Sequence, residues 1–184
     1  IAAMAAAVSN APSVNRRQRV LVAEDNATSQ KVARHLLQNL GFSVDVVENG
    51  SQAVEAVRSG AYSAVLMDCS MPEVDGIEAT RRIRSGQRTE MRIPIIALTA
   101  SAFPEDEERC RRAGMDDFLV KPIQPQHLVS SLSNRIERSR LLRSFMVRDS
   151  LTGLLNHTAI KDQLEREVAR ANRMRTPLSF AMVD

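Results

Sequence analysis

Short apolar runs alternate along this 184-residue chain with longer segments whose apolar residues recur at helical spacing. After Glu24-Asp25, for example, Val32, Leu36 and Leu40 lie four positions apart, and Gly41 ends the segment. The predicted strands are residues 19–23, 43–47, 64–67, 95–98 and 117–120. Strands that alternate with helices need right-handed crossovers and lie parallel. The pattern therefore predicts an α/β fold with a doubly wound, five-stranded parallel sheet.

Chemically reactive side chains follow four of these predicted strands. They belong to the motifs Glu24-Asp25, Asp68, Thr99-Ala100 and Lys121-Pro122. Because the carboxyl ends of parallel strands meet at one edge of a sheet, we expect these groups to lie together. A single aspartate after a strand more often caps the next helix. The three accompanying motifs instead favour Asp68 as an acceptor of a phosphoryl group.

Three carboxylates at one edge of a sheet repel one another unless a cation lies among them. Mg²⁺ prefers oxygen ligands, binds one or two carboxylates directly, and completes its shell with water and phosphate oxygens. We therefore predict Mg²⁺ as the cofactor. Asp68 would attack phosphorus as the nucleophile, while the metal, Lys121 and the Thr99 hydroxyl neutralise the phosphoryl oxygens.

Residues from about Arg19 to Leu132 resemble the receiver domain of two-component response regulators in the order, spacing and context of these motifs. The resemblance implies a receiver domain over residues 18–132, with a flavodoxin-like sheet of strand order 2-1-3-4-5. The implied roles are phosphoacceptor for Asp68, metal ligation for Glu24, Asp25, Asp68 and the Ser70 carbonyl, phosphate binding for Thr99, Ala100 and Lys121, and an aromatic switch for Phe118. Asp25 would ligate the metal directly, and Glu24 mainly through water. The family usually has a cis peptide bond at the position of Lys121-Pro122.

The same resemblance implies that a histidine kinase or a histidine phosphotransfer protein donates the phosphoryl group to this chain. It also implies a homodimer, formed through the long C-terminal helix or through the receiver face around Pro104–Lys121. A phosphohydrolase with an aspartyl nucleophile would share much of this chemistry. Such an enzyme normally needs a second acid two residues after the nucleophile, where this chain has Ser70.

Charge and hydropathy restrict the other functions to consider. No apolar run approaches the length of a membrane span, and we expect a cytoplasmic protein. Residues 1–129 hold 15 Lys and Arg against 16 Asp and Glu, and residues 130–184 hold 10 against 6, so the basic excess lies in the tail. A basic tail is typical of nucleic-acid binding. Its arginines alternate with acids at helical spacing, which favours a salt-bridged, solvated helix instead.

Two further clusters have simple structural interpretations. The acids of residues 105–108 would lie on the first turn of a helix, where the helix dipole favours them, so we interpret them as a solvated face rather than a metal site. The two cysteines, Cys69 and Cys110, lack metal-ligand spacing and form no disulfide framework. We expect buried, reduced thiols without a redox role.

The segments that flank the receiver differ in character. Residues 1–17 are rich in alanine and lack the basic region of a signal peptide, so we interpret them as a linker or the frayed end of an upstream segment. Residues 133–148 continue the last receiver helix, because no Gly or Pro interrupts the chain from Gln126 to Val147. This linker helix has two interpretations of equal weight, a coiled coil and a helix that packs on its own receiver.

Residues 149–184 resemble the beginning of a GGDEF diguanylate cyclase domain. The resemblance lies in the motif Asp149-Ser150-Leu151-Thr152-Gly153-Leu154, a helix, and a strand that ends at Asp184. It implies that Asp184 is a metal ligand of the cyclase in the parent protein. The catalytic Gly-Gly-Asp/Glu-Glu-Phe loop is not among these residues, so we expect this chain alone to be inactive as a cyclase.

These observations lead to two hypotheses of function. The first is a phosphorylation-controlled regulator whose C-terminal output would make cyclic di-GMP. The alternative is the receiver of a hybrid histidine kinase, or a stand-alone relay regulator, without an enzymatic output. The segment from Asp149 to Asp184 distinguishes them, because a relay receiver has no need of it.

Overall fold

The computed structural model describes residues 18–87, 92–101 and 103–147, and eight further residues after position 147. The chain divides into two compact units, residues 1–139 and 140–184. The predicted linker of residues 1–17 lies outside the described residues. So does most of the segment predicted to begin a GGDEF domain, including Asp184.

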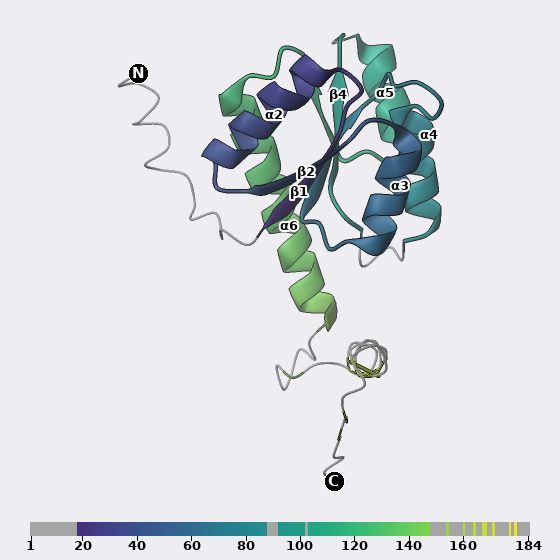
Figure 1. The fold of residues 1–184 in the computed structure, drawn as a ribbon, viewed down its shortest axis with the longest axis vertical. Coiled ribbons are helices and arrows are strands. Elements are labelled where there is room, and N and C mark those ends of the chain that lie inside the picture. The colour runs from purple at the N-terminus through teal and green to yellow at the C-terminus, as the bar shows by residue number, and fades with distance from the viewer. Residues whose placement is uncertain are drawn as a thin grey trace. The chain divides into compact units, whose positions relative to one another are not determined.

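Five parallel strands form a single sheet in the order β2-β1-β3-β4-β5 (Figure 1). They are β1 (Arg19–Ala23), β2 (Ser43–Val47), β3 (Ala64–Asp68), β4 (Ile95–Thr99) and β5 (Asp117–Val120). In the register Leu21 pairs with Val65, and Leu98 pairs with Leu119. The doubly wound, flavodoxin-like sheet predicted from the sequence is thus confirmed.

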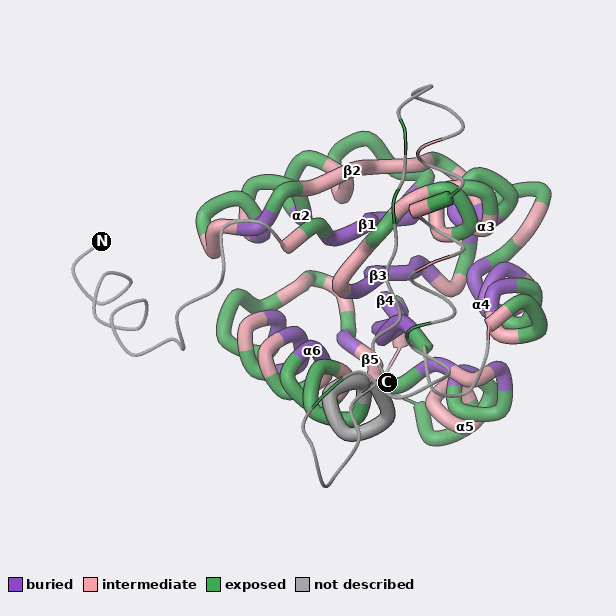
Figure 2. The backbone as a smooth tube through the Cα atoms, turned by 90° about the horizontal axis from the view of Figure 1, so that it is seen from below, coloured by how far each residue is buried: buried purple, intermediate pink, exposed green. Residues whose placement is uncertain are grey.

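Helices cover both faces of this sheet (Figures 1 and 2). They are α2 (Ala27–Asn39), α3 (Gly50–Ser59), α4 (Gly76–Ser85), α5 (Pro104–Ala113) and α6 (Pro125–Val147). One apolar cluster unites α2 and α6 with one face of the sheet, and the other unites α3, α4 and α5 with the opposite face. Each strand contributes to both clusters because successive side chains point to opposite faces.

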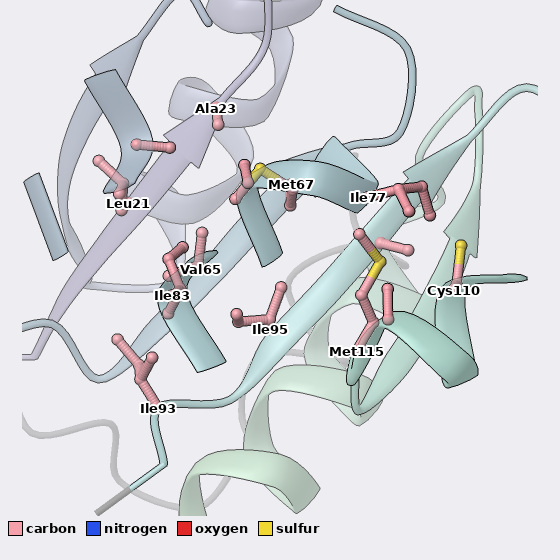
Figure 3. Packing of buried hydrophobic residues seen from close by; sticks show 14 of the residues in the cluster. Leu21, Ala23, Val65, Met67, Ile77, Ile83, Ile93, Ile95, Cys110 and Met115 are labelled. Atoms are coloured by element: carbon pink, nitrogen blue, oxygen red, sulfur yellow. The ribbon is translucent and has the colours of Figure 1, made fainter. Parts of the chain in front are cut away.

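The two clusters show how strictly the strands follow this alternation. Leu21, Val65 and Ile95 point toward α3, α4 and α5 (Figure 3), whereas Val20 and Val22 point toward α2 and α6. All five side chains are fully buried. Burying one such side chain contributes about 1.5–3 kcal/mol. This packing on both faces holds the strands, and the residues at the strand ends, in fixed positions.

Helix α6 packs on the receiver through its first half. Leu128, Leu132 and Ile136 are buried against the sheet, whereas Leu141 and Leu142 are about half exposed. The interpretation of a helix packed on its own receiver therefore holds for this first half. In the part of the chain that the structure describes, no helix is long and apolar enough to cross a membrane.

Candidate functional site

Three strand ends bring two acids and one base together at the carboxyl edge of the sheet. Glu24 follows β1, Asp68 ends β3, and Lys121 follows β5. Main-chain hydrogen bonds extend the ladder to these positions. The Glu24 amide donates to the Val47 carbonyl at 3.1 Å, and the Lys121 amide donates to the Thr99 carbonyl at 2.8 Å. The fold thereby holds the backbone from which each side chain projects.

The Lys121 ammonium lies between the two carboxylates. Its Nζ is 2.7 Å from Asp68 Oδ2 and 2.7 Å from Glu24 Oε2. Glu24 is only 1% exposed and Asp68 only 5%. The contact with Asp68 is a hydrogen bond, whereas the contact with Glu24 has the distance of an ion pair without the direction of a hydrogen bond. Glu24 Oε2 is consequently a buried oxygen that lacks a hydrogen-bond donor among the described residues.

The cluster contains three carboxylates and one ammonium. The side chain of Asp25 is exposed, and one oxygen from each of Glu24, Asp25 and Asp68 lies within 4.8 Å of the others. Carboxylate oxygens at this separation could hold a hard divalent cation. The excess of negative charge fits such an ion, because the ion would supply the charge that Lys121 alone does not. The buried Glu24 Oε2, which lacks a hydrogen-bond donor among the described residues, fits it as well.

The pKa values of Glu24 and Lys121 are both raised, for different reasons. Burial raises the pKa of the Glu24 carboxyl above its usual range; Lys121 opposes this shift, and the Asp68 carboxylate adds to it. Partial burial alone would lower the pKa of Lys121, but Asp68 and Glu24 outweigh it and raise that pKa. Lys121 therefore stays positively charged at neutral pH, and a second positive charge would stabilise ionised Glu24.

The loop after Asp68 approaches the site closely at a glycine. A Cβ atom at Gly76 would lie 2.0 Å from the Asp68 carbonyl oxygen, so no larger residue fits without movement. The helix that begins at Gly76 is capped by Asp75, whose carboxylate accepts from the Glu78 amide at 2.7 Å. Asp68 is therefore not the cap of α4, and the capping alternative is wrong.

The loop between Asp68 and Gly76 contains a tight turn. The Val74 amide donates to the Pro72 carbonyl at 2.8 Å, and Glu73 between them has a φ of 65°. This is the left-handed region, which is costly for residues with a side chain. The Asp68 carboxylate also accepts from the Ser70 amide at 3.1 Å. The turn thus lets the chain fold back over Asp68.

The contacts of Thr99 and Phe118, two other predicted site residues, are with groups outside this cluster. The Thr99 hydroxyl donates to the Ser101 carbonyl at 3.0 Å and accepts from the Ser101 amide at 3.2 Å. Ala100 is exposed, and Phe118 is half-buried against the apolar cluster under α3, α4 and α5. The expected cis bond at Lys121-Pro122 is present.

Two glycines, Gly50 and Gly76, were not predicted as site residues. Gly50 begins α3, and a Cβ atom there would lie 2.4 Å from the Val74 carbonyl. The two glycines therefore hold the loop from both sides. A glycine as the first residue of a helix, directly after a capping Asn or Asp, was the available signal. Residues 88–91, residue 102 and Asp184 lie outside the described part of the chain.

Comparison with known proteins matches most of this chain to one family. The family model "Response regulator receiver domain" matches residues 20–133. Hybrid signal transduction histidine kinase B of Dictyostelium discoideum is 39% identical over 122 residues, which cover 61% of this chain and 6% of that protein. The chain spans between 6% and 16% of the length of the first curated relatives that it matches.

Solved structures show the same similarity. The receiver domain of sensor histidine kinase PA1611 from Pseudomonas aeruginosa PAO1 is 44% identical, with a TM-score of 0.61 over 66% of this chain and 98% of that one. It has a magnesium ion coordinated in its active site cleft. The receiver of Ssk1 from Saccharomyces cerevisiae, solved with the histidine phosphotransfer protein Ypd1, is 28% identical, with a TM-score of 0.61 over 67% of this chain and 91% of that one. The chain described here belongs to the response regulator receiver domain family.

Proposed function

We propose that Asp68 of this receiver accepts a phosphoryl group from a phosphohistidine. The observation that carries the proposal is the position of the Asp68 carboxylate, which lies beside the Lys121 ammonium and within reach of Glu24 and Asp25. An Asp68 oxygen attacks phosphorus, the phosphorus–nitrogen bond breaks, and the histidine ring leaves with the electron pair of that bond. Lys121 then pairs with the phosphoryl oxygens and stabilises their charge.

The residues at the edge of the sheet fit a magnesium ion. Asp25, Asp68 and the Ser70 carbonyl would hold it, and Glu24 would act through bound water. This assignment is supported by the excess of carboxylates and by the buried Glu24 Oε2, which lacks a hydrogen-bond donor among the described residues. The magnesium in the PA1611 receiver supports it as well. When bound, the metal would neutralise phosphoryl oxygens and so lower the barrier to attack.

The switch residues complete the proposal. Phosphorylation adds oxygens that can accept hydrogen bonds. The Thr99 hydroxyl would leave its contact with Ser101 and donate to the phosphoryl group, and Ala100 would offer its main-chain amide. Phe118 would then turn inward and alter the surface next to α6. Thr99 and Phe118 lie on adjacent strands that pair in register, which supports a coupling between them.

A histidine kinase or a histidine phosphotransfer protein would be the donor. The complex of the Ssk1 receiver with Ypd1 supports a phosphotransfer protein as one such partner. The relatives, several of them named hybrid histidine kinases, favour a receiver from a protein of that class. The second candidate is the regulator with a cyclase output, which rests on the resemblance of residues 149–184. Reading the parent gene beyond the codon for Asp184 separates these candidates.

The assignment of Asp68 is tested by incubating the chain with acetyl phosphate and Mg²⁺ and measuring the phosphorylated fraction. Asp68→Asn removes the nucleophile and should abolish labelling. Asp75→Asn is the matched control, since the amide can still cap α4, and it should label like the unmodified chain. Undiminished labelling of Asp68→Asn, in protein with an unchanged circular dichroism spectrum, would overturn the assignment.

A further inference from the structure

Two cysteines meet beside the phosphoacceptor. Cys69 directly follows Asp68, and Cys110 lies on α5, 41 residues further along the chain. Their Sγ atoms are 3.4 Å apart, and both thiols are free. The sequence predicted reduced thiols without a redox role and did not predict that they touch. A disulfide bond needs the sulfur atoms to approach by only roughly another 1.4 Å.

The backbone on each side keeps this contact in place. The Cys69 amide donates to the Leu98 carbonyl at 3.0 Å, and its carbonyl accepts from the Gly76 amide at 3.3 Å. The Cys110 carbonyl accepts from the Met115 amide at 3.1 Å, where the chain leaves α5. Cys110 is 5% exposed, and Cys69 is partly exposed. The two sulfur atoms therefore meet inside the packed domain rather than at a mobile surface.

We propose that Cys69 and Cys110 form a reversible intramolecular disulfide under peroxide, and that this bond slows phosphoryl acceptance at Asp68. The first half of the proposal stands on geometry alone, and the second half rests on the proposed function. Peroxide oxidises one thiol to a sulfenic acid and releases one water. The other thiol then displaces a second water as the sulfur–sulfur bond forms. Two electrons pass from the thiols to peroxide, and a dithiol reductant returns them.

Access of small oxidants to the pair is restricted. Cys69 is the more exposed thiol, and Cys110 lines a cavity of about 140 Å³ together with Met115, Phe118 and Arg135. The partly exposed Cys69 is therefore the side from which peroxide would reach the pair.

A disulfide at this position would restrain the phosphoacceptor. It would join the residue after Asp68 to α5 and draw that residue toward the helix. Gly76, which contacts both the Cys69 carbonyl and the Asp68 carbonyl, would transmit the shift to the loop over the site. Phosphoryl transfer is sensitive to misplacement of about 1 Å in the attacking group. The oxidised protein should therefore accept phosphate more slowly.

The bond itself is tested on the full chain after treatment with hydrogen peroxide, and separately with diamide, which spares the eight methionines that peroxide also oxidises. Alkylation and peptide mapping should show that both thiols are protected and that one peptide pair is linked through Cys69 and Cys110. Cys110→Ala and Cys69→Ala should each retain one alkylatable thiol. Two thiols that stay fully alkylatable, or a disulfide found only between chains, would overturn the proposal.

The regulatory half is tested by acetyl phosphate labelling of oxidised and reduced protein. Oxidation should slow labelling of the unmodified chain by up to about 100-fold, and dithiothreitol should restore it. Cys110→Ala should label at the rate of the reduced chain with or without oxidant. Equal rates in both states of the unmodified chain, with the mapped disulfide present, would overturn this half. Loss of labelling in every sample would instead overturn the proposed function and leave the mapped disulfide standing.

Discussion

At the carboxyl edge of the sheet two buried carboxylates share one ammonium, whereas near its amino end one carboxylate has two donors. There Asp45 accepts hydrogen bonds from Arg19 and from the Tyr62 hydroxyl, the latter at 2.9 Å. The Arg19 guanidinium also lies over the Tyr62 ring, 4.9 Å from its centre. The side chains of Arg19 and Asp45 are 47% and 44% exposed. Every group of this second cluster has a partner, and water solvates what remains.

The two clusters differ in how well their charges balance, which distinguishes a structural cluster from a reactive one. In the Asp45 cluster the charges balance, so the cluster needs nothing from outside the chain. In the Glu24 and Asp68 cluster three carboxylates have one ammonium, and the buried Glu24 Oε2 has an ion pair with Lys121 but no hydrogen-bond donor among the described residues. A bound cation would balance the remaining negative charge of this cluster. The following predictions test whether the two clusters differ in this way.

The largest expected effect follows from removal of the shared ammonium. Lys121→Met keeps the length of the side chain and removes its charge, so acetyl phosphate labelling should fall by roughly 100-fold. Arg19→Met makes the same kind of change in the balanced cluster and should leave labelling unchanged. Similar losses in the two variants would show that labelling responds to stability and not to the local charge.

Metal affinity should separate the clusters next. Asp25→Asn removes a charged ligand from an exposed side chain and should weaken Mg²⁺ binding by about tenfold or more. Asp45→Asn neutralises a carboxylate in the other cluster and should not change that affinity. Isothermal titration calorimetry measures both constants directly. Equal affinities of Asp25→Asn and the unmodified chain would remove Asp25 from the proposed metal site.

The two clusters should also have opposite effects on stability as pH changes, in buffer with a chelator. Because burial raises the pKa of Glu24, ionising it costs stability, which falls as pH rises from the usual range of glutamate through the raised value. Partial burial alone would raise the pKa of Asp45, but hydrogen bonds from Tyr62 and Arg19 lower it. Its stabilisation is therefore present above the usual range of aspartate and is lost as pH falls through the lowered value.

Urea denaturation over a series of pH values would measure this difference. Glu24→Gln should remove the loss of stability on the alkaline side of its window, and Asp45→Asn should remove the loss on the acid side. The comparison is made between each variant and the unmodified chain at the same pH, so that other titrating groups cancel. Parallel curves for both variants would contradict the assigned directions.

The smallest effect is expected at Tyr62. Tyr62→Phe removes the hydrogen bond to Asp45 and keeps the ring under Arg19, so the free energy of unfolding should fall by less than about 1 kcal/mol. Circular dichroism is the suitable probe, because Tyr62 is the only tyrosine and the chain has no tryptophan. A loss of several kcal/mol would show that this cluster is less solvated than its exposure indicates.

The fold was largely predictable because its signal is local. Apolar runs predicted all five strands, and Gly41 and Gly60 correctly predicted where two helices end. Two strands, β3 and β4, extend one residue further than predicted, to Asp68 and Thr99. These polar residues still join the ladder, because the next strand supplies main-chain partners. Hydropathy alone does not detect such pairing.

The site was predictable only as a set of residues. Strand ends predicted that Glu24, Asp68 and Lys121 would meet, as they do. Three details of the site depend on tertiary packing, which has no signature in the local sequence. They are the lack of a hydrogen-bond donor to Glu24 Oε2, the contact of the Thr99 hydroxyl with Ser101, and the close approach of Gly76. The contact of Cys69 with Cys110 is of the same kind. The chemical roles of these residues, and of Asp184, stay predictions.

The close approach at Gly76 also sets how freely this chain can change. A side chain at position 76 would collide with the main chain of Asp68, and one at position 50 would collide with the main chain of Val74. At Gly86, directly after the other end of the same helix, a Cβ atom would make only ordinary van der Waals contacts, with its nearest neighbours 3.8 Å away. A library of substitutions should therefore be nearly empty of survivors at positions 50 and 76 and well populated at position 86. Tolerance to mutation at these glycines therefore depends on how closely the main chain of the loop approaches them.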